Sequence, residues 1–166
     1  MLAPEDKNSL FELIQTNADR LYKYFPITAK EVSSLVAAEY YIQKKMREVA
    51  SRKNYTFKIV ASQSQLPIGL LIIKRINWKH KTCELAYFID RKYEGQGITS
   101  AGISQLITYA KETLGLRSAR IHIGEDNPGS LRIAVKHHFE LIKRIKNGHE
   151  DFHGNVMDVL EFEREL

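Results

Sequence analysis

Cysteine is almost absent from this sequence, which contains a single one, Cys83. An internal disulfide framework is therefore excluded, and a lone thiol is typical of proteins that work in a reducing cytoplasm, which is the location we expect. One cysteine and six scattered histidines also offer no spacing typical of a zinc site, so we expect no bound metal.

Long apolar runs are absent as well. The longest, LPIGLLIIKRI at residues 66–76, falls far short of the roughly 20 residues that a membrane-spanning helix needs. The first residues, MLAPEDKNSLFE, are acidic and polar rather than basic and then apolar, so they do not predict a secretion signal. We therefore expect no association with a membrane.

No block of like charge appears either. The 25 lysines and arginines are interspersed with 20 aspartates and glutamates, which leaves a net charge of +5. Because nucleic-acid-binding proteins usually cluster their basic residues, we expect no direct binding of nucleic acid. A mild positive excess suits any anionic ligand. The length predicts one domain, residues 1–166.

The hydrophobic period changes along the chain. Apolar residues recur at helical spacing over residues 4–24 and again over 30–52. Apolar runs rich in β-branched residues then predict strands, interrupted by two more helices. The predicted strands are 55–62, 67–76, 82–90, 119–124, 139–145 and 156–163, the later helices are 98–114 and 127–138, and a turn is expected at 146–155. This order predicts an α/β layer structure.

The stretch DRKYEGQGITS, residues 90–100, stands between a predicted strand and a predicted helix. Gly95 and Gly97 are compatible with an ordinary turn, because glycine adopts positive φ at little cost. They are equally compatible with a bare backbone that lets an anion approach the N–H groups at the helix start. No Gly-Lys-Ser/Thr follows, and Ser100 stands where a GxGxxG motif has its third glycine, so neither an ATP nor an NAD motif is present.

Further motif residues occur in a fixed order around this turn. They are Glu84 on the third predicted strand, Gly95 and Gly97, then Asn127 and Ser130, and finally Lys136 and Phe139. From about Leu66 to the C-terminus, the succession resembles the GNAT acyl-CoA N-acetyltransferases, and among them the RimJ/RimL type of ribosomal-protein N-terminal acetyltransferases. The chain departs from that family pattern at Glu94, at Thr99 and at His138, which replaces a glycine before Phe139.

The resemblance implies an α+β fold with a central mixed, mostly antiparallel sheet, splayed at an acyl-CoA cleft, with helices on both faces. It also implies acetyl-CoA as co-substrate. The residues expected around its pyrophosphate are Gly95, Gln96, Gly97, Ile98, Thr99 and Ser100. The backbone of Phe88 and Ile89 would bind the pantetheine arm, Asn127 and Ser130 would face the thioester, and Lys136 would face the adenosine phosphate. Asn127 alternatively serves as a helix cap only, and Lys136 as a surface charge only.

Acetyl transfer to an amine needs a base for the amine's proton and a partner for the leaving thiolate. Glu84 is the first candidate base, because a carboxylate in an otherwise apolar strand usually faces a cleft or a partner. His122 is the rival, since an unperturbed histidine titrates at about pH 6.5. Ser130 is the candidate for contact with the thiolate. Purely structural roles for Glu84 and His122 remain open.

The expected function is therefore direct, acetyl-CoA-dependent acetylation of a primary amine. A protein N-terminal α-amino group is the first choice of acceptor, and polyamines, amino-sugar antibiotics and amino acids are the alternatives. Two further interpretations stay open, a non-catalytic acyl-CoA-binding module and a partner-binding protein on the same scaffold. The sequence does not distinguish a monomer from a homodimer.

Overall fold

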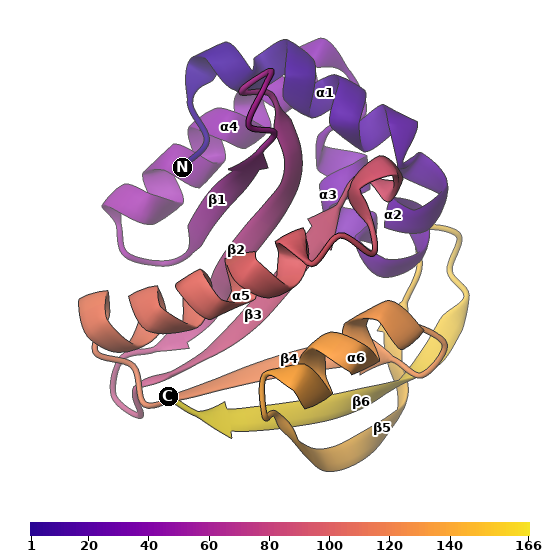
Figure 1. Ribbon diagram of the computed structural model, residues 1–166. Helices are drawn as coiled ribbons and strands as arrows, with labels where there is room; N and C mark the ends of the chain where they lie inside the picture. The colour runs from indigo at the N-terminus through magenta and orange to yellow at the C-terminus, as the bar shows by residue number, and fades with distance from the viewer.

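One six-stranded sheet organises the computed structural model, which describes all residues 1–166 (Figure 1). The strands are β1 (Tyr55–Val60), β2 (Pro67–Asn77), β3 (Thr82–Ile89), β4 (Ser118–Gly124), β5 (Glu140–Glu150) and β6 (Val156–Glu165). Their order across the sheet is β1-β2-β3-β4-β6-β5. Every neighbouring pair is antiparallel except β3 and β4, which are parallel. The expected mixed, mostly antiparallel sheet is confirmed.

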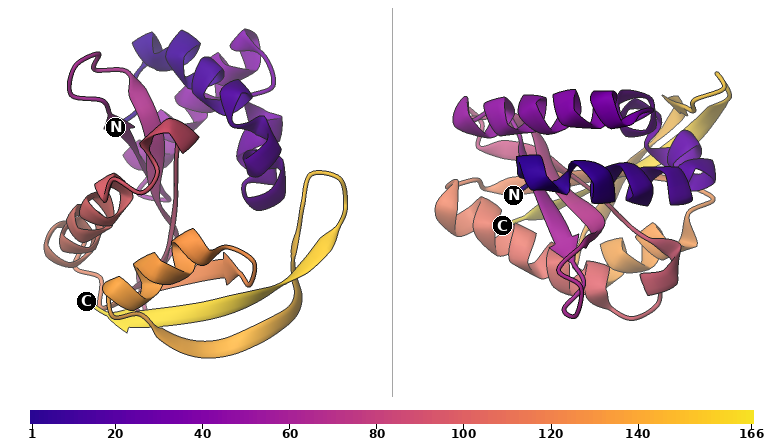
Figure 2. Two further views of the ribbon diagram at one scale, coloured as in Figure 1. Left: turned by 45° about the vertical axis from the view of Figure 1, so that its right-hand side comes forward. Right: turned by 90° about the horizontal axis from the view of Figure 1, so that it is seen from above.

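The parallel pair holds together only at its beginning. Thr82–Glu84 pair with Ser118–Arg120, and no pairing follows. Beyond this point β3 stays bound to β2 as far as Ile89, while β4 stays bound to β6 as far as Gly124. The two halves of the sheet therefore diverge like the arms of a V, which Figures 1 and 2 show from different sides. The expected splay is confirmed.

Helices cover both faces of the sheet, also as expected (Figure 2). The N-terminal helices lie over one face and are α1 (Lys7–Thr16), α2 (Ala18–Tyr24), α3 (Pro26–Glu31) and α4 (Leu35–Ala50). The other face carries α5 (Ile98–Thr108) and α6 (Pro128–Lys136). No helix is both long and apolar enough to span a membrane.

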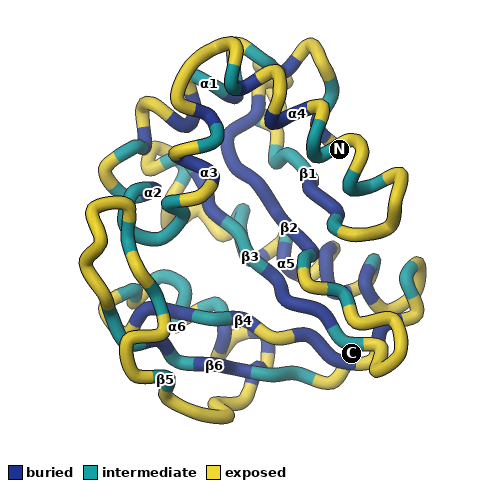
Figure 3. Tube along the Cα trace, turned by 180° about the vertical axis from the view of Figure 1, so that it is seen from behind, coloured by how far each residue is buried: buried dark blue, intermediate teal, exposed yellow.

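Side-chain alternation along β3 divides the apolar core in two. Cys83 and Leu85 belong to the cluster packed by α5 and α6, whereas Phe88 belongs to the cluster of the N-terminal helices, with Ala86 packed against it. Figure 3 shows the buried residues running along β2, β3 and β4 through the middle of the molecule. Glu84 shares the face of Ala86 and Phe88, so its carboxylate lies on the side of the N-terminal helices.

The first predicted helix, residues 4–24, is not continuous. A short 3₁₀ turn at Pro4–Asp6 precedes α1, and Asn17 separates α1 from α2. The buried side chain of Asn17 donates to the Leu13 carbonyl at 3.0 Å and accepts from the backbone N–H of Arg91 at 3.1 Å. An asparagine that bonds to backbone in this way competes with helical hydrogen bonding, and the chain turns there.

The second predicted helix, residues 30–52, is also wrong in its bounds, because two helices occupy this region. Pro26 starts α3, which ends before Val32, and Ser34 caps α4 by accepting from the Ala37 N–H at 3.1 Å. Proline at a first helical position and serine at an N-cap are both start signals in the sequence. The apolar spacing alone did not reveal the break between them.

The predicted turn 146–155 is shorter in the structure, where it covers only 151–155. Residues 146–150 continue β5, and His149 and Glu150 are in register with Met157 and Val156 of β6. These residues are polar and have low strand propensity, so pairing with β6 decides their conformation.

The helix predicted over 98–114 ends as α5 at Thr108, followed by a π-helical turn at Tyr109–Thr113.

The end of α6 shows why the family pattern has a glycine at the position that His138 occupies in this chain. The N–H of His138 donates to the Val135 carbonyl at 3.0 Å and that of Phe139 to the Ala134 carbonyl at 2.9 Å, which together form a Schellman motif. The motif requires a left-handed residue, and His138 has φ of 55°. A side chain other than glycine is strained in that conformation.

We expect His138→Gly to raise the free energy of unfolding by about 1 kcal/mol, because glycine adopts the left-handed conformation without this strain. Urea unfolding of the two proteins measures the difference. His138→Ala is the control, since it removes the imidazole but keeps the Cβ. If His138→Ala stabilises as much as His138→Gly, the strain is not the cause.

Candidate active site

The diverging strands line a cleft of about 1070 Å³. Its walls are the unpaired part of β3, the facing part of β4, the loop before α5, the first turn of α6 and parts of the N-terminal helices. All the predicted site residues line it with one exception, Gln96. The structure therefore brings together residues that span 53 positions of the chain, from Glu84 to Lys136.

The loop before α5 presents bare backbone to the cleft. Gly95 has φ of 72° and Gly97, the N-cap of α5, has φ of 78°. A Cβ added at either position would meet no atom within 4 Å. The first hydrogen bond of the helix runs from the Ala101 N–H to the Gly97 carbonyl, so the N–H groups of residues 98–100 precede any helical partner. Such a helix start binds anions.

Two side chains of this loop are engaged elsewhere. The Ser100 hydroxyl lies 3.0 Å from Nε2 of His137, which leaves mainly its backbone N–H for the cleft. The side chain of Gln96 is exposed and donates to the Lys92 carbonyl at 3.0 Å. We therefore expect Gln96 and Ser100 to contact a ligand through their backbone groups rather than through their side chains.

An arginine of α2 ties the loop to the end of β3. Arg20 pairs with Glu94 at 2.6 Å and donates to the Ile89 carbonyl at 3.2 Å. The Ile89 carbonyl thus already has a partner, which removes one of the backbone groups expected to bind a ligand. Phe88 offers backbone alone, because its ring packs in the core against Phe25 at a centroid distance of 5.5 Å.

Across the cleft, α6 begins with the expected cap. Oδ1 of Asn127 accepts from the Ser130 N–H at 3.1 Å, so the capping role is confirmed. The amide nitrogen of Asn127 makes no hydrogen bond to the protein and remains available as a donor. Lys136 is exposed at the other end of α6 and also lines a smaller adjoining pocket with His138 and Arg164.

The vertex of the V holds a buried acid–base cluster. His122 on β4 lies between two carboxylates, with Nε2 3.0 Å from Oε2 of Glu161 and Nδ1 3.5 Å from Oε2 of Glu84. Both glutamates are buried, with exposed fractions of 7% for Glu84 and 5% for Glu161. Glu84 is also the last residue of β3 that pairs with β4. Both candidate bases therefore belong to one cluster.

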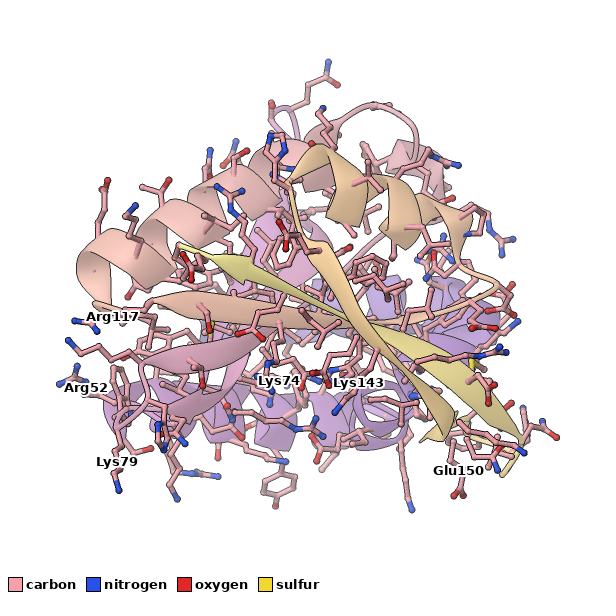
Figure 4. The ribbon with its side chains drawn as sticks, turned by 90° about the horizontal axis from the view of Figure 1, so that it is seen from below. Arg52, Lys74, Lys79, Arg117, Lys143 and Glu150 are labelled. Carbon is pink, nitrogen blue, oxygen red and sulfur yellow. The ribbon has the colours of Figure 1, made fainter.

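Cations complete a charged row across the sheet. Lys74, the partner of Glu84 in the β2–β3 register, contacts it at 2.8 Å, and Arg75 contacts it at 2.7 Å. On the other side, Lys143 of β5 lies 3.6 Å from Glu161. Figure 4 shows Lys74 and Lys143 reaching toward the middle of the sheet from β2 and β5.

These neighbours set the titration of the cluster. Burial raises the pKa of Glu84, but His122, Lys74 and Arg75 outweigh it and lower that pKa to about 2. The Glu84 carboxylate raises the pKa of His122, burial opposes this effect, and Glu161 adds to it. Glu84 is thus a weak base by itself, whereas His122 holds a proton more firmly than an isolated imidazole does.

The partners of His122 also define its tautomer. The carboxylate of Glu161 only accepts hydrogen bonds, so Nε2 carries the proton in the neutral ring. Nδ1 then has the free lone pair. It is buried, has no hydrogen-bond partner, and faces Glu84. The arrangement is a basic nitrogen oriented by one carboxylate and screened from solvent by another.

Contacts between distant segments close the open end of the V. Tyr24 of α2 donates to Asp126, after β4, at 3.1 Å, and His149 of β5 donates to a backbone carbonyl of α2 at 2.6 Å. The rings of Tyr22 and Phe152 stack at 4.4 Å. Figure 2 shows the β5–β6 hairpin reaching toward α2 in this way. The cleft is therefore bounded at both ends.

The sequence analysis did not single out Glu161 and Tyr87, which flank or line the cleft. Glu161 stands opposite His122 in the β4–β6 register, and as a glutamate in an apolar strand it carries the signal that singled out Glu84. Tyr87 lines the cleft from the unpaired part of β3, and its hydroxyl is buried without a hydrogen-bond partner. No local pattern distinguishes Tyr87 from the other aromatic residues of the chain.

Comparison with known families places these features in context. The family model described as an acetyltransferase (GNAT) domain matches residues 1–140. A ribosomal-protein-serine acetyltransferase of Escherichia coli (strain K12) is 35% identical over 74 residues, which cover 45% of this chain and 41% of that protein. A spermidine N(1)-acetyltransferase of Vibrio cholerae is 27% identical over 107 residues, which cover 62% of this chain and 58% of that protein. The matches span 41–65% of the length of the curated relatives.

Solved structures agree with the fold. RimL, a ribosomal L7/L12 α-N-protein acetyltransferase solved in complex with coenzyme A, superposes with a TM-score of 0.90. The two chains are 21% identical, and the superposition covers 99% of this chain and 91% of that one. At this identity the comparison shows a shared fold.

Proposed function

This chain belongs to the GNAT acetyltransferase family, and from that premise we propose that it transfers an acetyl group from acetyl-CoA directly to a primary amine. The observation that carries the proposal is the cleft between β3 and β4. The unpaired N–H groups at the start of α5 lie on one side of this cleft, and an acid–base cluster lies where the two strands separate. Acyl transfer needs both features, an anion site to hold the donor and a group to take the amine's proton.

The residues of the cleft fit acetyl-CoA. The open space at Gly95 and Gly97 admits a pyrophosphate to the N–H groups of residues 98–100. Arg132 and Lys136 line the same cleft and supply positive charge for the phosphates. RimL, which shares the fold, was solved with coenzyme A bound. When bound, acetyl-CoA supplies an acetyl thioester.

The cluster at the vertex takes up the proton of the acceptor amine. Glu84 lines the cleft and receives this proton first, because Nδ1 of His122 is closed to solvent. The pKa of Glu84, lowered to about 2, makes it a transient carrier. Nδ1 of His122, 3.5 Å away, is the stable destination, and Glu161 holds the ring in the tautomer that can accept.

The start of α6, on the side of the cleft opposite the loop before α5, orients the acetyl group. Asn127 keeps its amide N–H free while its oxygen caps α6, so a donor from a fixed helix start faces the cleft. A rigidly held donor is suited to the oxygen of the acetyl carbonyl, where negative charge develops during transfer. Ser130, in the first turn of α6, lines the same wall and would contact the sulfur of a bound acetyl-CoA.

We infer that the acceptor is a protein N-terminal α-amino group. The relatives named above include acetyltransferases of ribosomal proteins, and one spermidine acetyltransferase favours a polyamine instead. The charges at the vertex argue against a polyamine. Lys74, Arg75 and Lys143 surround the two buried carboxylates there, so a second ammonium group on the acceptor meets like charge.

Replacing Gly97 by valine tests the donor site. We expect Gly97→Val to abolish binding of acetyl-CoA in calorimetry, because the side chain fills the space that the pyrophosphate needs and β-branching resists positive φ.

Gly115→Val is the matched control for this variant. Gly115 follows the other end of the same helical segment, has φ of 67° and also has no atom within 4 Å of a built Cβ. It suffers the same backbone strain but lies outside the cleft. Unchanged affinity in a folded Gly97→Val protein, or equal loss in both variants, would contradict the proposed site.

The proton path predicts a specific pH dependence. We expect kcat/KM of the wild type to rise with pH along a limb whose apparent pKa lies above 6.5, since His122 must be neutral to accept a proton. Glu161→Gln removes a negative charge that raises the pKa of His122, so this limb moves to lower pH. His122→Gln lowers kcat by about 10²-fold or more.

Glu163→Gln serves as the control for Glu161→Gln. Glu163 lies on the same strand and face, pairs with Arg120 at 3.0 Å and does not contact His122, so the limb stays in place. Full activity in His122→Gln together with none in Glu84→Gln would show that Glu84 acts alone.

A further inference from the structure

The end of β2 breaks the alternation of side chains next to Glu84. Ile73 belongs to the core cluster packed by α5 and α6, so regular alternation would turn Arg75, two residues further on, to that same face. Lys74 and Arg75 nevertheless both contact Glu84, at 2.8 and 2.7 Å. Two consecutive residues of the strand therefore reach one carboxylate, which lies on the face of the N-terminal helices.

A β-bulge with a strained residue produces this arrangement. The register between β2 and β3 shifts between Lys74 and Asn77, and Arg75 has φ of 52°. The N–H of Arg75 donates at 3.2 Å to Oδ1 of Asn54, the residue before β1. A residue other than glycine costs free energy in this left-handed conformation, and strain of this kind is concentrated at functional sites. Here it turns a guanidinium toward the cleft instead of the core.

Glu84 occupies only a part of the Arg75 guanidinium. Nη1 of Arg75 donates to Oε2 of Glu84, while Lys74 contacts the other carboxylate oxygen. A guanidinium carries five N–H donors, and the side chain of Arg75 is 73% exposed. Arg75 also lines the cleft. It therefore keeps donors available for a further anion.

This anion is not the pyrophosphate of acetyl-CoA. Ile89, at the end of β3 next to the loop before α5, pairs with Gly69. Glu84 pairs with Lys74, which precedes Arg75. Five residues of strand lie between Ile89 and Glu84, a distance of about 17 Å. Because the proposed function brings the acceptor amine to Glu84, an anion beside Arg75 belongs to the acceptor.

We propose that Arg75 binds a carboxylate of the acceptor, and that the preferred acceptor is a protein N-terminus with aspartate or glutamate as its second or third residue. The inference rests on the proposed function. A guanidinium binds a carboxylate through two parallel hydrogen bonds, which fix its orientation. Arg75 contacts Glu84, so the amine and the carboxylate of the acceptor are held next to each other. A carboxylate one or two residues from the α-amino group has the reach that this arrangement needs.

Three peptides that differ only at their second and third residues test the inference. They carry aspartate, asparagine or lysine there, and each has a free α-amino group. We expect kcat/KM of the wild type to be about 10-fold higher for the aspartate peptide than for the asparagine peptide, and lowest for the lysine peptide. In Arg75→Gln the aspartate-to-asparagine ratio falls to about 1, and in Arg75→Lys it stays above 1 because the charge remains. Each ratio is measured within one protein, so a general loss of activity cancels.

Arg52→Gln is the matched control. Arg52 also has positive φ, 55°, and its guanidinium carbon lies 4.5 Å from the centroid of the Trp78 ring, outside the cleft. Figure 4 shows Arg52 at the edge of the molecule, away from Lys74. The variant removes the same charge as Arg75→Gln, and we expect it to keep the wild-type ratio.

Equal kcat/KM for the three peptides in the wild type overturns the inference and leaves acetylation of α-amino groups intact. A preference that survives in Arg75→Gln, or that Arg52→Gln abolishes, overturns the inference as well. Acetylation of none of the peptides contradicts the proposed function instead.

Discussion

The site depends on one constraint, that β3 and β4 share only three paired positions before they separate. Each strand remains bound along its other edge, β3 to β2 and β4 to β6, and the apolar cluster that α5 packs against contains buried residues of both half-sheets. This shared cluster therefore joins the two halves where the strand pairing is missing. The unpaired edges instead leave backbone groups facing a cleft, where a ligand or water must satisfy them.

The gap also gives the two sides of the cleft different chemistry. Because side chains alternate along a strand, Glu84 and Tyr87 point to opposite faces of β3. Helix starts supply the neutral donors, at Gly97 on one lip and at Asn127 on the other. Cross-strand register supplies the charges, since Lys74 stands opposite Glu84 and Glu161 opposite His122. The parts of the proposed reaction thus follow from secondary structure rather than from long loops.

Much of this could be predicted from the sequence because its signals are local. Apolar runs rich in β-branched residues predict the strands, and two glycines predict the loop before α5. Asn127 before Pro128 predicts the cap of α6. What failed were features decided by distant partners. Asn17 breaks a helix because it bonds to Arg91, and residues 146–150 form a strand because β6 pairs with them. The pairing of His122 with Glu161 depends on a register between strands 39 positions apart, which periodicity does not contain. Sequence therefore identified single residues of the site, and structure was needed to show which of them act as a group.

Acetyl transfer itself is the most direct test of the account. The purified protein is incubated with acetyl-CoA and, in separate reactions, with a peptide carrying a free α-amino group, the same peptide with that group blocked, and spermidine. Mass spectrometry follows the acceptor and a thiol reagent follows release of coenzyme A. The account predicts one acetyl group on the free α-amino group, with one thiol released for each, and no transfer to the blocked peptide or to spermidine. Transfer to spermidine alone would contradict the inferred acceptor. Tight binding of acetyl-CoA without transfer to any amine would contradict the enzymatic function and leave a binding module.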